Sequence, residues 1–150
     1  MKHKQKMFLF LIIFTAFLAA CGGSAAPEGG AAPQDAAIEV VTYDIYFGED
    51  ADNLGNPPVW TAKAGSLATV TFENKGGLEH NWAVIRQGVE IPVPFEMENN
   101  NDLILYDTGV VQPGEQRSFP FQVPDEPGEY IVICTVSGHY PTMQGRFVVT

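Results

Sequence analysis

The sequence predicts an all-β protein, a Greek-key β-sandwich, preceded by a signal segment and a flexible tether. Three observations support this fold class. Short runs of β-branched and aromatic residues recur along the chain, turn-forming clusters separate them, and no helical period of useful length appears. This spacing suits two packed sheets of short strands. Residues 38–150 are enough for one domain of ordinary size.

The segment from residue 1 to 20 is expected to be a secretory signal. Three lysines precede an apolar run from Met7 to Ala20, which is shorter than the roughly 20 apolar residues that a membrane span needs. The run ends in Leu-Ala-Ala-Cys, which looks like a bacterial lipobox, so Cys21 is expected to be lipidated and to begin the mature chain. An ordinary cleavage site beside a chance cysteine is the alternative.

Residues 21–37 are interpreted as the lipidated cysteine and a flexible linker. Gly, Ala and Pro dominate this segment, which offers no large apolar side chain for packing. A flexible chain of this length spans about 20 to 24 Å. Two acyl chains on Cys21 would therefore hold the domain at a membrane surface while the linker lets it turn.

The domain from residue 38 to 150 contains the expected strands and two expected loops. The strands are residues 38–47, 67–73, 81–86, 103–107, 117–123, 129–136 and 146–150. Residues 49–58 and 87–102 are rich in polar and turn-forming residues, and both are interpreted as surface loops. Pro120 has no backbone N–H to donate, so the strand that contains it is predicted to be an edge strand or to be bulged.

One tight loop near the end of the chain carries three residues that can bind a metal. Cys134, His139 and Met143 lie five and then four residues apart, after an apolar strand that ends in a turn. Each residue alone is more often an ordinary core or surface group, but together they offer a thiolate, an imidazole and a thioether. His80 is the remaining candidate for a second imidazole, because His3 leaves with the signal. This ligand set is typical of a blue-copper electron-transfer site.

The two cysteines of the chain support a metal site. If lipid blocks Cys21, Cys134 has no partner within the chain, and an unpaired thiol in an exported protein needs a reason such as metal coordination. A disulfide between Cys21 and Cys134 is the alternative, and it would tie a flexible tail to a core strand.

Two motifs resemble those of the cupredoxins, the type 1 blue-copper family, and in particular the azurin and auracyanin type. The motifs are C-T-V-S-G-H-Y-P-T-M-Q-G at residues 134–145 and E-H-N-W at residues 79–82. The resemblance extends over about residues 38–150 and departs from the family pattern at Ser137 and Glu79. It implies the cupredoxin fold and one copper ion that alternates between Cu(I) and Cu(II). It implies as metal ligands His80, Cys134, His139 and Met143.

The resemblance also implies a residue that links the two ligand segments. In the family, the Asn that follows the first His joins these segments by hydrogen bonds near the thiolate, and this position is Asn81. Such bonds help to set the reduction potential. Trp82, the next residue, is expected to be part of the core rather than an electron relay.

We therefore expect a membrane-anchored, extracytoplasmic lipoprotein that carries electrons. It should lie on the outer face of a bacterial cell membrane or in the periplasm. We expect it to be a monomer and not an enzyme. The resemblance suggests as partners membrane-associated redox proteins such as cytochromes or respiratory and photosynthetic complexes. A copper-delivery protein, in which the metal is cargo, is the main alternative. A copper oxidase or nitrite reductase would need a second copper centre, and both mature histidines are already used.

Charge and polarity indicate how partners would be recognised. Without the signal the chain has five basic and 18 acidic residues, a formal charge of −13, which argues against nucleic acid as a partner. No charged residue occurs from Thr135 to Gln144. Around His139, Val136, Tyr140 and Pro141 are therefore predicted to form an apolar electron-transfer patch.

Overall fold

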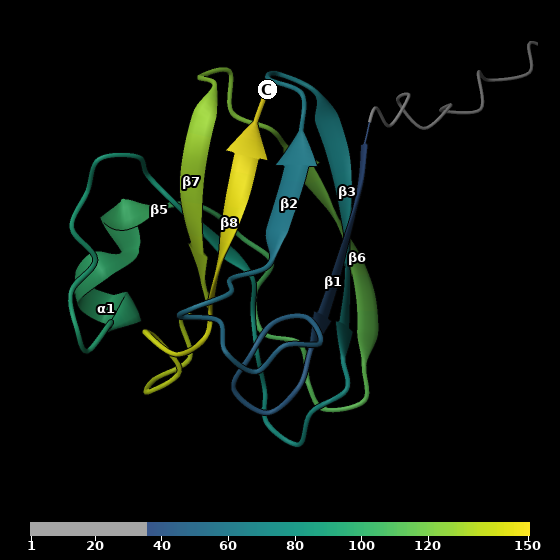
Figure 1. The fold of residues 1–150 in the computed structure, drawn as a ribbon, viewed down its shortest axis with the longest axis vertical. Helices are drawn as coiled ribbons and strands as arrows, with labels where there is room; N and C mark the ends of the chain where they lie inside the picture. The colour runs from purple at the N-terminus through teal and green to yellow at the C-terminus, as the bar shows by residue number, and fades with distance from the viewer. Residues whose placement is uncertain (1–35) are drawn as a thin grey trace, which may run out of the picture. The chain divides into compact units, whose positions relative to one another are not determined.

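Two β-sheets make up the part of the chain that the structure, a computed structural model, describes, which is residues 36–150 (Figure 1). The three-stranded sheet has the order β1-β3-β6, and these strands span Ala36–Thr42, Leu67–Asn74 and Gln116–Gln122. The five-stranded sheet has the order β2-β8-β7-β4-β5, and these strands span Val59–Ala62, Gln144–Val149, Gly128–Ile133, Ala83–Ile85 and Ile104–Asp107. The predicted signal, Cys21 and most of the predicted linker lie outside the described residues.

The strands pair mostly with antiparallel neighbours. The exceptions are β1 with β3 and β2 with β8, which run parallel. Along β3 every second residue is buried, and β8 shows the same alternation, so each strand turns one face toward the space between the sheets. The predicted all-β sandwich is confirmed.

Trp82 lies at the centre of the core between the sheets. Its side chain is fully buried, and the ring centroids of Trp60, Phe121 and Phe147 lie 5.6 to 5.8 Å from its own, all in edge-to-face arrangements. Burying this apolar surface contributes on the order of 4 to 6 kcal/mol to folding. Because Trp82 follows Asn81 directly, the core also holds the segment that carries His80.

The observed strands differ from the expected ones mainly at their ends. The first strand was expected to reach Phe47, but β1 ends at Thr42, and after a turn Phe47 comes back to form an antiparallel bridge with Thr42. Strand β2 was not expected. It is only four residues long and begins directly after Pro57 and Pro58. Pro120 lies exposed on β6 at the edge of its sheet, as expected.

Residues 87–103, here called the flap, are more than the expected surface loop. They contain the short helices α1 (Met97–Asn100) and η1 (Asn101–Leu103), and they pack against the outer side of the five-stranded sheet. Phe95 is 3% exposed and lies in a second apolar cluster with Ile85 and Ile133. The loop interpretation was wrong on this point, because the two prolines before Phe95 and the polar run after it are typical of a surface loop. No helix among residues 36–150 is long and apolar enough to cross a membrane.

Candidate metal centre

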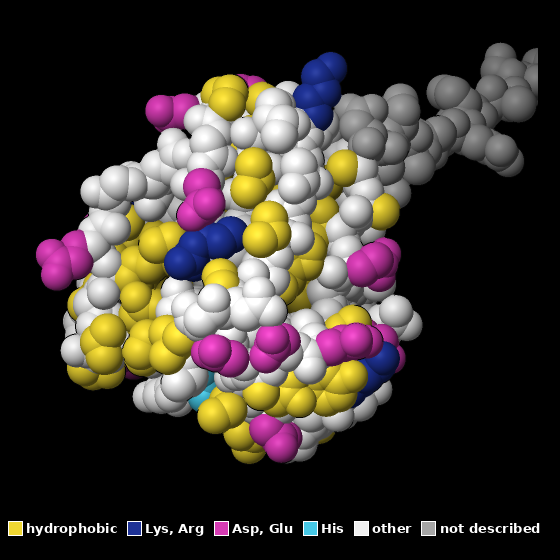
Figure 2. Space-filling model, in the orientation of Figure 1, with side chains coloured by type: hydrophobic (Ala, Val, Ile, Leu, Met, Phe, Trp, Pro, Cys, Tyr) yellow, Lys and Arg dark blue, Asp and Glu magenta, His cyan; other side chains and the backbone are white. Residues whose placement is uncertain are grey.

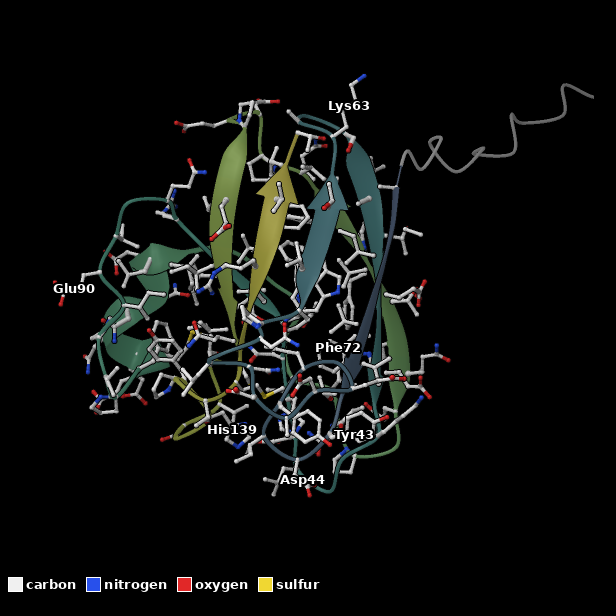
Figure 3. All side chains as sticks on the ribbon, viewed as in Figure 1. Tyr43, Asp44, Lys63, Phe72, Glu90 and His139 are labelled. Atoms are coloured by element: carbon white, nitrogen blue, oxygen red, sulfur yellow. The ribbon has the colours of Figure 1, made fainter. Side chains whose placement is uncertain are left out.

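Two strands and one turn bring His80, Cys134 and His139 together at one end of the sandwich. His80 precedes β4 and forms an antiparallel bridge with Val111, while Cys134 follows directly after β7. His139 lies in the next turn, at the end of the molecule opposite Lys63 (Figure 3). His80 and Cys134 are fully buried, and His139 retains 8% of its exposure.

The donor atoms of these three residues converge. Sγ of Cys134 lies 3.4 Å from Nδ1 of His139 and 3.8 Å from Nδ1 of His80, and the two Nδ1 atoms are 3.2 Å apart. All the potential ligand atoms lie within 4.8 Å of one another. One ion could therefore contact both imidazoles and the thiolate without a change of backbone.

Met143 returns to Cys134 through the loop between β7 and β8. The Cys134 N–H donates to the Met143 carbonyl over 3.2 Å, and the Met143 N–H donates to the His139 carbonyl over 2.9 Å. The Met143 side chain is fully buried in the same core cluster as Cys134. Gly138 allows the tight turn, since its φ of 83° lies in the left-handed region that favours glycine.

The Asn81 side chain joins the segment of His80 to the segment of Cys134. Its Oδ1 accepts the Thr135 N–H over 2.7 Å, and its Nδ2 donates to Thr135 Oγ1 over 2.7 Å and to Asp107 Oδ1 over 2.8 Å. Asn81 is 1% exposed, so these bonds form away from water. They connect residues next to the two candidate ligands His80 and Cys134.

A third segment, residues 107–111, braces the His80 segment from another direction. His80 and Val111 exchange two backbone hydrogen bonds, of 3.2 and 2.7 Å, and the Trp82 N–H donates to Thr108 Oγ1 over 3.0 Å. Sequence reasoning missed this segment. Its available signal was the polar Asp-Thr-Gly at residues 107–109, which ends an otherwise apolar strand.

Burial keeps the centre uncharged when no metal is bound. It lowers the pKa of His80 to about 4, with a further lowering by His139, and it also lowers the pKa of His139. Burial raises the pKa of the Cys134 thiol to about 11, against the opposite effect of the Asn81 and Val136 backbone amides. Two neutral imidazoles and a thiol result, so a cation that binds here must displace the thiol proton.

The Tyr43 backbone influences the protonation of His80. Its Nε2 is buried and makes no hydrogen bond within the described residues, although the Tyr43 backbone carbonyl lies near enough to oppose the lowering of the His80 pKa. Gly76 lets this carbonyl approach, because a Cβ at that position would collide with the Tyr43 oxygen. With the imidazole proton on Nε2, Nδ1 of His80 is free to bind a metal.

The donor set fits copper. Imidazole and thiolate suit copper and zinc, whereas magnesium and calcium prefer oxygen ligands, and no carboxylate belongs to this group of donors. Met143, which is fully buried in the same core cluster as Cys134, carries a thioether, and a weakly bound Met is typical of blue-copper sites.

Comparisons with known proteins agree with this chemistry. The profile of a family described as "copper binding proteins, plastocyanin/azurin family" matches residues 56–150. Auracyanin-A from Chloroflexus aurantiacus is 29% identical over 166 residues, which cover 99% of each chain. The solved structure of auracyanin A, described as a "blue" copper protein, aligns with a TM-score of 0.60 at 26% identity over 76% of this chain and 98% of that one.

Another solved structure shows the same fold. An auracyanin from Roseiflexus castenholzii aligns with a TM-score of 0.61 at 23% identity, covering 80% of this chain and 99% of that chain. Copper is therefore the metal that the family, the fold and the donor set have in common. The chain belongs to the plastocyanin/azurin family of copper-binding proteins.

Proposed function

We propose that the protein is a blue-copper electron carrier that passes one electron at a time between membrane-associated redox partners. The observation that carries the proposal is the buried convergence of Cys134 Sγ with the Nδ1 atoms of His80 and His139. Copper bound there supplies one-electron chemistry by alternating between Cu(II) and Cu(I). The protein itself performs no bond-making step and is not an enzyme.

Copper would be held by the Nδ1 atoms of His80 and His139, by the Cys134 thiolate and, more weakly, by the Met143 thioether. Their support is the dense packing around them, since His80, Cys134 and Met143 all have no exposed surface. A close-packed interior resists rearrangement of its side chains. The ligands are thus held in nearly one geometry for both oxidation states, which favours fast electron transfer.

The absorption spectrum of the copper-loaded, oxidised protein tests the proposal. We expect an intense band in the red that arises from the copper–thiolate bond, and we expect Cys134→Ser to lose it even if copper still binds. Ser137→Ala changes an exposed residue three positions further along the same loop and should keep the band. A full band in Cys134→Ser would contradict the assignment of Cys134 as a copper ligand.

The burial of the site argues against copper as cargo. A delivery protein must release its metal to a partner, but His80 and Cys134 are fully buried, and Asn81 joins their segments by two hydrogen bonds to Thr135. An absorption spectrum without the thiolate band, from a protein that nevertheless binds copper, would favour delivery instead.

We place the docking surface for redox partners at the end of the molecule where His139 lies. Val136, Tyr140 and Pro141 are each partly buried there, so they offer apolar area around the imidazole. Neighbouring loops extend this surface with the exposed side chains of Ile45, Leu78 and Val110. In Figure 2, apolar side chains gather at this lower end, below a row of acidic ones.

The proposed chain order is a signal at residues 1–20, a lipidated Cys21 with a linker to residue 37, and the copper domain at residues 38–150. The support is the lipobox in the sequence. The lipid would keep the protein on the extracytoplasmic side of a membrane, as a monomer, near partners such as cytochromes or respiratory and photosynthetic complexes. A mass spectrum of the membrane-bound protein without an added lipid on Cys21 would contradict the anchor.

A further inference from the structure

Asp107 is a partly buried carboxylate beside the candidate copper centre. One of its oxygens, Oδ1, accepts two hydrogen bonds, one from Asn81 Nδ2 and one from the Gly109 N–H, both over 2.8 Å. Neither of the two ion pairs found among residues 36–150 involves Asp107. Its negative charge is therefore balanced by hydrogen bonds alone within the described part of the chain.

Asp107 and Thr135 together determine which way the Asn81 amide points. A carboxylate only accepts hydrogen bonds and a backbone N–H only donates, so Nδ2 must face Asp107 and Oδ1 must face the Thr135 nitrogen. A flipped amide would set oxygen against the carboxylate and N–H against N–H. Asp107 thereby fixes the group that positions Thr135, the residue next to Cys134.

The carboxylate also adds a negative charge close to the centre. Oxidation raises the positive charge of the copper ion by one unit, and a nearby negative charge stabilises the more positive state. The intervening Asn81 is buried, so water screens this interaction less than it would at the surface. The charge of Asp107 should thus favour Cu(II) over Cu(I).

We propose that Asp107 is a positioning residue that fixes the Asn81 amide and, through its charge, lowers the reduction potential of the copper site. The inference deepens the proposed function and depends on copper being bound by His80, Cys134 and His139. It concerns a third segment, 107–111, which supplies none of the proposed ligands.

Asp107→Asn separates the charge from the hydrogen bonds. Both bonds go to the same oxygen, and Asn also has one Oδ1, so the variant can keep both while losing the charge. We expect its midpoint potential to rise while the thiolate band keeps its position and intensity. Glu90→Gln is the matched control, because Glu90 is exposed and lies well away from His139 (Figure 3). A potential for Asp107→Asn no higher than that of Glu90→Gln would overturn the charge effect.

Asp107→Ala removes the charge and both hydrogen bonds. In the metal-free protein, we expect the Thr135 amide hydrogen to exchange about tenfold faster in this variant, because the amide of Asn81 loses one of its anchors. Asp107→Asn should restore the parent rate. Unchanged exchange in Asp107→Ala would overturn the positioning role.

The two proposals fail in different ways. If the parent protein lacks the thiolate band, the blue-copper assignment is wrong, and the role of Asp107 in setting a copper potential is wrong with it. If the parent shows the band but Asp107→Asn has the parent potential, the carrier function stands and the role of Asp107 in setting the potential is wrong.

Discussion

Met143 combines two roles at the scale of a single residue, since it is a proposed ligand and a fully buried core side chain. Met143→Leu keeps nearly the same volume, so the free energy of unfolding should change by less than about 1.5 kcal/mol. A weak axial thioether contributes little binding but tunes the potential. We therefore expect copper to remain bound and the potential to rise, as measured by redox titration. Loss of copper would show that Met143 is a primary ligand.

His80 should make the stability of the metal-free protein depend on pH. Burial lowers its pKa from 6.5 to about 4, so at intermediate pH the unfolded chain binds a proton that the folded chain does not. The free energy of unfolding should therefore fall as the pH drops from about 6.5 to about 4. Urea unfolding at a series of pH values measures this. His80→Gln lacks the group and should show a shallower fall, and identical curves for both proteins would contradict the expectation.

The candidate ligands could be found from the sequence because three of them lie within ten residues. Cys134, His139 and Met143 form a local pattern, and His80 followed by elimination. Asp107 and Tyr43 could not be found in this way. They come from segments far away in the chain: the pairing of β4 with β5 brings Asp107, the last residue of β5, to the centre, and the turn after β1 brings Tyr43.

The flap shows what sequence patterns miss at the scale of an element. Its Pro, Glu and Asn residues suggest a solvated loop, yet the buried Phe95 and the partly buried Val89, Ile91 and Leu103 pack it against the outer face of β4 and β7. Strand β2 was missed for a related reason, since four residues hold too little pattern to identify a strand that is defined by its parallel partner β8. The long strands were predicted because alternation over several residues is visible without a partner.

Phe95 should make a large contribution to stability if the flap is part of the fold. Phe95→Ala removes a side chain that is 3% exposed, and we expect a loss of about 3 to 5 kcal/mol in the free energy of unfolding. Val93→Ala, in the same segment but at a side chain that is 65% exposed, should change it by less than about 0.5 kcal/mol. Urea unfolding compares the two variants, and equal small effects would mean that the flap is dispensable for folding.

At the scale of the whole molecule, the two ends of the sandwich differ in function. His139 and the proposed docking surface lie at one end, and Lys63 lies at the other (Figure 3). Pro141→Glu and Lys63→Gln each lower the net charge by one unit, but only the first places a charge on the docking surface. We expect Pro141→Glu to slow electron transfer to a redox partner in stopped-flow experiments, and Lys63→Gln to have little effect. Colour and potential should change little in Pro141→Glu, because water and salt screen a charge at the surface more than they screen the charge of Asp107. Equal slowing by both would indicate that net charge, rather than the apolar end, controls docking.

Strand β1 separates the point where the preceding chain joins the domain from the end that holds the copper. It runs from Ala36 to Thr42 and leads directly into the turn of Tyr43 and Asp44 at the end where His139 lies. An extended strand advances about 3.3 Å per residue, so the joining point and the copper end are roughly 20 Å apart. A domain that is held at Ala36 would rotate about that residue. The copper end would then sweep the widest arc, which would let one anchored molecule reach a donor and an acceptor by swinging rather than by diffusing.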